Sequence, residues 1–115
     1  MSGRRKGIDA EREAVRLLRA EGLRVLRIAR DRDAPEGLDV DAVILPDGGG
    51  DAVCVQIKRE ERPAGAWFHF IGPGRVLMCR RNGEDWAVWV RGALDDPPMA
   101  LDLFKFARWF RQGLV

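Results

Sequence analysis

Two apolar runs separated by a glycine-rich segment constrain the fold of this chain more than any other feature. The runs are DVDAVIL at residues 39–45 and AVCVQIK at residues 52–58, and PDGGGD separates them. Apolar runs of this length on both sides of a Gly-rich turn are typical of a β-hairpin. The sequence therefore predicts a β-sheet that contains this hairpin.

Four polar side chains interrupt the apolar pattern near the open end of the hairpin: Asp39, Asp41, Gln56 and Lys58. Side chains two positions apart in a strand share a face of the sheet. A turn that is symmetric about its central glycines sets Asp41 opposite Gln56 and Asp39 opposite Lys58. One face is then polar, and the other carries the apolar positions Val40, Ala42, Ile44, Val53, Val55 and Ile57.

The rest of the chain surrounds this hairpin with further strands and two helices. Apolar residues at three- and four-residue spacing predict helices, alternation predicts strands, and Gly and Asn-Gly mark ends and turns. The expected elements are a helix at 8–21, strands at 23–29, 75–81 and 85–92, and a helix at 98–112. This order indicates an α/β or α+β sheet with helices against it, in a single domain over residues 1–115.

Composition and charge exclude several classes of protein. Hydrophobic residues make up 46% and charged residues 33% of the 115 residues, which argues against intrinsic disorder and a disulfide scaffold. No apolar run approaches the roughly 20 residues that span a bilayer, and the N-terminus lacks the apolar segment of a signal peptide, so we expect a cytoplasmic protein. The net charge of +2 does not by itself indicate a nucleic-acid partner. Cys54 and Cys79 lie in apolar runs, where we expect free thiols.

A carboxylate lies within the apolar stripe of the first predicted helix. At about 100° per residue, the stripe falls within about 60° of Glu11, whereas Glu13 points to the opposite side. The stripe consists of Ile8, Ala14, Val15 and Leu18. A buried Glu is costly unless it is paired or binds a metal ion. Glu11 is therefore a functional candidate, and the alternative is that the edge of the stripe is solvated or that Glu11 pairs with a neighbouring Arg.

The polar end of the hairpin has the donor atoms that a divalent cation requires. Asp39, Asp41 and Gln56 offer oxygen ligands of the kind that Mg²⁺ prefers, and Glu11 is available to join them. Mn²⁺ accepts the same ligands. The simpler alternative is a salt bridge between Asp39 and Lys58 on a solvated sheet face, which needs no metal ion.

The order of these features resembles the PD-(D/E)XK nuclease superfamily. KGIDAERE, LDVDAV and CVQIK are particularly similar to archaeal-type Holliday junction resolvases, whose first helix opens with Lys-Gly-x-x-x-Glu-Arg-Glu. That opening is here Lys6, Gly7, Glu11, Arg12 and Glu13, and the resemblance covers roughly residues 4–58. It implies an α/β fold with a mixed central β-sheet flanked by helices. It also implies a metal-dependent endonuclease that resolves four-way DNA junctions in recombination and repair.

Carried over residue by residue, the resemblance assigns the active site to Glu11, Asp41, Gln56 and Lys58. Mg²⁺ would be held by Asp41, the Gln56 amide, the Ile57 backbone carbonyl and, directly or through water, Glu11. Lys58 would orient the attacking water or neutralise charge in the transition state. The expected reaction is hydrolysis of a phosphodiester bond.

Two choices within this assignment stay open. Asp41 is preferred as the metal ligand because the register sets it opposite Gln56, and Asp39 is the alternative. Gln56 stands where these resolvases usually have Glu, and Gln-x-Lys variants occur in Mrr-like restriction enzymes. An Mrr-like restriction-type DNA endonuclease and a non-catalytic DNA-binding module on the same fold are therefore the alternative functions.

Basic residues close to the candidate site are expected to contact DNA phosphates without reading base sequence. They belong to an N-terminal basic arm over residues 1–7 and to loops beside the site strands: Arg4, Arg5, Lys6, Arg30, Arg32, Arg59 and Arg62. A four-way junction must be cut on two opposing strands, so we also expect a homodimer with two sites. Aromatic residues of the last helix, such as Trp109 and Phe110, or residues 67–70 are the expected contact.

Overall fold

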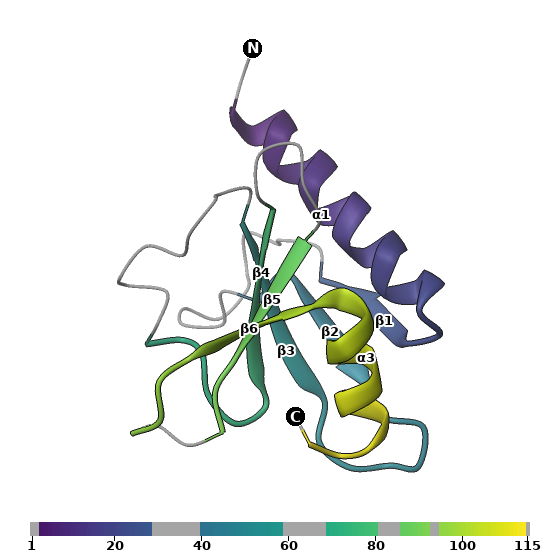
Figure 1. The fold of residues 1–115 in the computed structure, drawn as a ribbon. Helices are drawn as coiled ribbons and strands as arrows, with labels where there is room; N and C mark the ends of the chain where they lie inside the picture. Colours follow the sequence, from purple (N-terminus) through teal and green to yellow (C-terminus); the bar gives the residue numbers. More distant parts are fainter. Residues whose placement is uncertain (1–2, 29–39, 59–68, 81–85, 93–94, 115) are drawn as a thin grey trace.

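The computed structural model describes residues 3–28, 40–58, 69–80, 86–92 and 95–114, with side chains in the first helix from Asp9 onward. These residues form two helices and six strands (Figure 1). In chain order the elements are α1 (Gly3–Ala20), β1 (Arg24–Arg27), β2 (Ala42–Leu45), β3 (Val53–Lys58), β4 (Arg75–Arg80), β5 (Trp86–Val90), β6 (Met99–Asp102) and α3 (Leu103–Arg111).

The strands form one sheet whose spatial order follows the chain, from β1 at one edge to β6 at the other. β3 and β4 are parallel, and the other neighbouring pairs are antiparallel. The sheet is therefore mixed. The expectation of an α/β fold with a mixed sheet and accompanying helices is confirmed at this level.

Both helices pack against the same face of the sheet. Leu18 of α1 and Phe106 of α3 are fully buried in one core cluster with strand residues such as Val55. Figure 1 shows α1 beside β1 and α3 near β5 and β6 on that side. The opposite face carries a smaller cluster, made of Ile71, Leu77, Cys79 and the partly buried Trp89.

The first hairpin pairs as its glycine-rich turn predicts. β2 and β3 are antiparallel, with Ala42 opposite Val55 and Ile44 opposite Val53, which is the register of a turn centred on its middle glycines. Gly49 and Gly50 have φ values of 82° and 119°, a region that favours glycine. The apolar face enters the core as predicted, but the strands begin later, at Ala42 and Val53, than the predicted residues 39 and 52.

The second predicted hairpin is also confirmed. β4 and β5 are antiparallel, with Leu77 opposite Trp89 and Arg80 opposite Trp86. Their inward residues, which include Val88, are buried against the helices. The predicted turn at residues 82–83 lies outside the described residues.

The predicted C-terminal helix at 98–112 is wrong over its first part. Met99–Asp102 is strand β6, paired with β5, and helix α3 begins only at Leu103. Asp102 has an extended backbone, and its side chain accepts the N–H of Lys105 at 2.7 Å, which caps the helix. Met, Ala and Leu favour helices, but pairing with β5 and burial of Leu101 override that weak preference.

The first helix differs from expectation at its start and at Glu13. It begins at Gly3 rather than at residue 8. The Glu13 side chain does not point away from the sheet, because its carboxylate accepts hydrogen bonds from Arg80 at 3.2 Å and from the Trp86 indole at 3.1 Å. The buried face of α1 is wider than the predicted stripe, because Ala10 and Leu17 also pack against the core. Glu13 therefore lies at the edge of the buried face, from which its side chain reaches donors on β4 and β5.

Neither Cys54 nor Cys79 forms a disulfide bond, as predicted. Cys79 is buried and Cys54 is half-buried, and the alternation of the strands places both on the face opposite the helices. Among the described residues, neither helix is long and apolar enough to cross a membrane.

Candidate functional site

Asp41 and Gln56 are the two buried polar side chains among the described residues, with exposed fractions of 1% and 0%. Both belong to the set that the sequence predicts as the active site. Burial of a carboxylate and an amide is costly unless other groups compensate them. Among the described residues, the buried polar side chains therefore lie at the open end of the first hairpin.

The Asp41 carboxylate is held against the backbone of β3. It accepts the N–H of Ile57 at 2.7 Å, a short hydrogen bond typical of a charged acceptor. Its own N–H donates to the Val55 carbonyl at 2.9 Å, and its carbonyl accepts the N–H of Ile28 at 2.9 Å. These backbone contacts tie Asp41 to β1 and β3 at the point where β2 begins.

Asp41 departs by one residue from the predicted register. The ladder pairs Ala42 with Val55, and the Asp41 N–H also reaches the Val55 carbonyl, so two residues face one, as in a β-bulge. The expectation that Asp41 pairs directly with Gln56 is therefore wrong in detail. The bulge aims the carboxylate at the next N–H group of β3, that of Ile57, which a regular strand would not do.

Gln56 is fully buried, and neither its amide nitrogen nor its amide oxygen has a hydrogen-bond partner in the part of the chain that is described. The side chain lies on the face opposite the helices, where its register partner in β4 is Leu77. A buried polar group without a partner costs about 1–3 kcal/mol. A bound ligand with a donor or a cation would satisfy this amide.

Lys58 is the last residue of β3 and is half-buried. It lies two residues after Gln56, so both side chains occupy the same face of the sheet. Its register partner in β4 is Cys79. The structure thus places the predicted ammonium beside the predicted amide, at the strand end where Asp41 contacts β3.

Glu11 lies on the helix side of the sheet, with 16% of its side chain exposed, and forms an ion pair with Arg27 at 3.3 Å. An arginine partner is one of the alternatives that the sequence leaves open for a carboxylate in this stripe. Arg27 is in register with Ala42, the residue after Asp41, so the ion pair lies close to the start of β2. Glu11 therefore flanks the same end of the hairpin from the opposite face to Gln56 and Lys58.

The donor atoms near Asp41 fit a hard divalent cation in chemical type. They are the Asp41 carboxylate, the Gln56 amide oxygen and the Ile57 carbonyl, which in an extended strand points to the same side as the Ile57 N–H. Among the described residues, no three Asp, Glu, His or Cys side chains form a group that could hold a metal ion. A cation held here would therefore depend on the neutral oxygens of Gln56 and Ile57.

Several predicted residues are not placed. Their side chains lie outside what the structure describes: Arg4, Arg5, Lys6, Arg30, Arg32, Asp39, Arg59, Arg62, Trp67 and Phe68. Asp41 is buried and contacts Ile57, which fits its preferred role as the metal ligand. The alternative, Asp39, lies outside the described residues.

The structure adds a basic surface that the sequence analysis missed. A cavity of about 350 Å³ is lined by Val15 and by Arg12, Arg16, Arg19 and Arg27. Arg19 is held in place by the Val25 carbonyl at 2.9 Å. Arg12, Arg16 and Arg19 are spaced by four and three residues along α1, which puts them on one face of the helix. This spacing could have predicted the basic surface from the sequence.

No protein-family model matches this chain, and no curated protein matches it. The residues of the site combine one buried acid, one buried amide that has no partner among the described residues, one ammonium and a neighbouring group of arginines.

Proposed function

We propose that this protein is a Mg²⁺-dependent DNA endonuclease that resolves four-way junctions on a PD-(D/E)XK-like fold. The observation that carries the proposal is Gln56, whose buried amide lacks a partner within the described residues and lies next in sequence to Ile57, which binds Asp41. An oxygen-ligated cation would satisfy this amide and balance the buried Asp41 carboxylate.

The arrangement of elements supports the fold part of the proposal. A helix that carries Glu11 precedes three antiparallel strands, Asp41 lies at the start of the second, and Gln56 and Lys58 end the third. This is the order of features on which the resemblance to resolvases rests. Asp41, Gln56 and Lys58 lie at the open end of the hairpin, and Glu11 is joined to it through Arg27. Asp39 lies outside the described residues.

Each candidate residue has a chemical role in this proposal. Asp41, the Gln56 amide and the Ile57 carbonyl would hold the cation, and Glu11, which pairs with Arg27 on the helix side of the sheet, would act through water at the open end of the hairpin. A bound Mg²⁺ activates water as a nucleophile and neutralises negative charge on a phosphate. Asp41 is kept in one orientation by the Ile57 N–H, and Lys58 supplies a fixed positive charge for the pentacovalent phosphate or orients the attacking water. The products are a 5′ and a 3′ end of the cut strand, one of which retains the phosphate.

The arginine surface on α1 supports a polyanionic substrate. Arg12 and Arg16 are exposed, and Arg27 joins them from β1 while pairing with Glu11. Such a row of guanidinium groups suits the phosphates of a nucleic-acid backbone, which it can contact without reading sequence. The surface is adjacent to the candidate site through the ion pair between Arg27 and Glu11.

Replacing Arg12 and Arg16 together with Ala should weaken junction binding and lower its salt dependence. Each lost phosphate contact reduces the slope of log K against log salt concentration by about 0.9, so the double variant should lose roughly two units. The measurement is a fluorescence-anisotropy titration at several salt concentrations. Arg24→Ala, an exposed arginine of β1 outside this surface, is the matched control. An unchanged slope in the double variant would show that Arg12 and Arg16 of α1 do not contact the DNA phosphates.

A Mg²⁺ titration against labelled four-way junction and linear duplex tests the function itself. Junction-selective incision is the expected result. Cutting of the linear duplex would instead favour the Mrr-like restriction-type enzyme, which the presence of Gln56 motivates. Binding without incision at any Mg²⁺ or Mn²⁺ concentration would contradict nuclease activity and leave a DNA-binding module.

A further inference from the structure

The face of the sheet opposite the helices carries apolar side chains along β1, β2 and β3. Leu26 is 52% exposed, and Ile28, the first residue after β1, is 40% exposed. The register sets Leu26 opposite Val43 and Val43 opposite Cys54, and both partners are half-buried. An antiparallel sheet with one face in water normally presents polar residues there. These four residues, which we call the outer strip, do not belong to the core cluster, so the core does not explain them.

The outer strip reaches the candidate site. The Ile28 N–H donates to the Asp41 carbonyl at 2.9 Å, so Ile28 lies beside the start of β2. On β3, Cys54 precedes Gln56 and Lys58 on the same face of the sheet. The outer strip therefore shares one face with the side chains proposed to bind the cation and the reacting phosphate.

Positive charge flanks the outer strip at this end. Arg27 lies between Leu26 and Ile28 in the chain, and its side chain, which is 34% exposed, turns to the helix side and pairs with Glu11. There it joins the arginine surface of α1. Lys58 lies on the outer face and is half-buried. Apolar and basic side chains that alternate along a strand edge complement a polyanion that also exposes apolar surface, and DNA with unstacked bases has both properties.

We propose that Leu26 and Ile28 insert at the branch point of the four-way junction and hold a base unstacked beside the phosphate that is cut. This inference rests on the proposed function and names the feature of the substrate that the protein selects. Apolar side chains that enter DNA in this way unstack bases at a cost of about a few kcal/mol per step. The cost is smallest where stacking is already interrupted. A linear duplex is stacked throughout, so the insertion favours the junction.

The position of β1 suits this insertion. β1 is the first strand of the sheet, and among the described strands only β2 pairs with it. Leu26 and Ile28 are two residues apart, which separates them by about 7 Å along an extended chain. This is about twice the rise of one base in a DNA strand, roughly 3.4 Å, so one base fits between the two side chains. Arg27, on the other face of the strand, is placed to contact a neighbouring phosphate.

A junction with 2-aminopurine at the branch point tests the insertion, in EDTA so that no strand is cut. Stacking quenches the fluorescence of 2-aminopurine, so binding of the wild-type protein should raise it. The combined change Leu26→Thr and Ile28→Thr should lose this rise, and the preference for junction over linear duplex should fall about tenfold. Both residues are exposed and threonine favours strands, so the variant should keep its fold.

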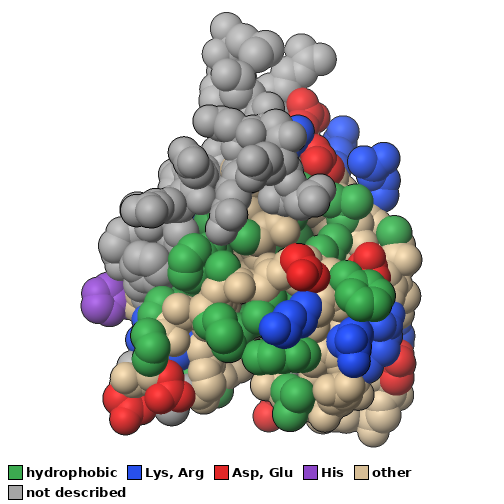
Figure 2. Space-filling model, viewed as in Figure 1, with side chains coloured by type: hydrophobic (Ala, Val, Ile, Leu, Met, Phe, Trp, Pro, Cys, Tyr) green, Lys and Arg blue, Asp and Glu red, His purple; other side chains and the backbone are tan. Residues whose placement is uncertain are grey.

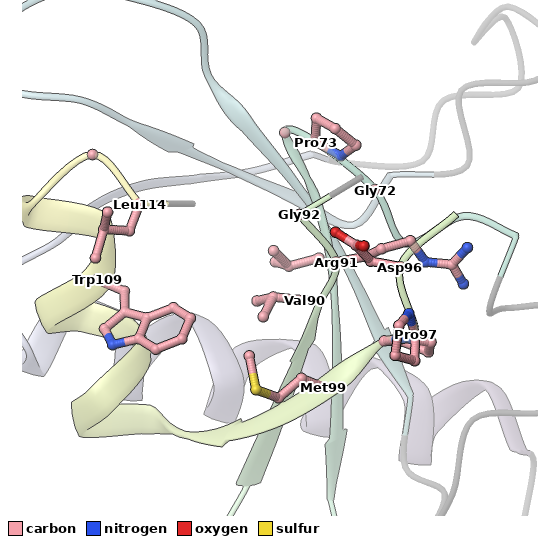
Figure 3. A pocket seen from close by; sticks show the side chains of 14 residues that line it. Gly72, Pro73, Val90, Arg91, Gly92, Asp96, Pro97, Met99, Trp109 and Leu114 are labelled. Atoms are coloured by element: carbon pink, nitrogen blue, oxygen red, sulfur yellow. The ribbon is translucent and has the colours of Figure 1, made fainter. Parts of the chain in front are cut away.

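Met99→Thr is the matched control, because Met99 is 46% exposed on β6, the opposite edge of the sheet. It lines a groove of about 700 Å³ with Trp109 and Val76 (Figure 3). The groove lies beside the start of β4, whereas Lys58 lies beside its end. Figure 2 shows acidic and basic side chains mixed around α3, which borders this groove, so charge there does not favour a polyanion. The control should raise the fluorescence as the wild type does.

A bound wild-type protein without a rise in fluorescence, or a double variant equal to the wild type, would overturn the inference. A change in the mass of the free double variant in light scattering would also overturn it, because the outer strip would then be a protein contact. A protein that unstacks the branch point but never cuts in Mg²⁺ contradicts the nuclease function alone. A protein that cuts junctions without unstacking contradicts the insertion alone.

Discussion

Asp41→Asn should lower the rate of DNA cleavage about a thousand-fold or more, equivalent to about 4 kcal/mol of activation free energy, while junction binding changes little. The substitution removes the negative charge that a cation at this site requires. It leaves an amide oxygen that can still accept the Ile57 N–H, so the bulge at the start of β2 is retained. Single-turnover cleavage and anisotropy binding, measured on the same preparation, separate the two effects.

Lys58→Ala should have a similar effect on cleavage, because it removes the only ammonium that the site places beside Gln56 among the described residues. Asp47→Asn, an exposed aspartate in the turn of the same hairpin, is the matched control and should cut DNA at the wild-type rate. Phosphate contacts come from other residues, so both site variants should still bind the junction. Loss of binding together with cleavage would refute this division of roles.

Gln56→Leu should make the protein more stable and inactive at the same time. The wild-type amide is fully buried without a partner among the described residues, and its replacement by an apolar side chain of similar volume removes a cost of about 1–3 kcal/mol. The free energy of unfolding, obtained by urea denaturation without metal ion, should rise by that amount. Cleavage should be lost because the neutral oxygen ligand is gone. A less stable Gln56→Leu variant would show that Gln56 serves the fold rather than a ligand.

Gln56→Glu provides the complementary test. It restores the charge that related enzymes use, so the variant should keep its activity or bind Mg²⁺ more tightly. Two carboxylates at positions 41 and 56 repel each other without a cation, so its stability should fall in EDTA and recover on addition of Mg²⁺. Complete inactivity of this variant would count against Gln56 as a metal ligand.

Local sequence determined the parts of the fold in which neighbours along the chain also pair in space. The turn between β2 and β3 contains three successive glycines, and two of them adopt φ values that glycine favours, so the register of the hairpin follows from the turn. The alternation of Val53, Val55 and Ile57 with Cys54, Gln56 and Lys58 assigned each side chain to its face. The polar cluster could be predicted from these features alone.

Tertiary structure determined the conformation of segments whose partners are distant in sequence, because those partners outweigh local secondary-structure preference. Met99–Asp102 has residues that favour a helix, yet it became an edge strand because β5 offers hydrogen bonds and burial. The same holds for Glu13, which Arg80 and Trp86 draw to the sheet, and for Glu11, which pairs with Arg27. None of these partners is near in sequence, so periodicity could not identify them.

The candidate site combines both kinds of information. Sequence placed Asp41 and Gln56 at one end of the hairpin, because strand pairing has a fixed period of two. Only the folded chain showed the bulge that turns Asp41 toward the Ile57 N–H and the burial that leaves the Gln56 amide without a partner in the described residues. Likewise, the groove of about 700 Å³ that Val76, Met99 and Trp109 line exists only because the sheet brings segments distant in sequence together. Burial and the aim of a side chain depend on packing between layers, which no local pattern encodes.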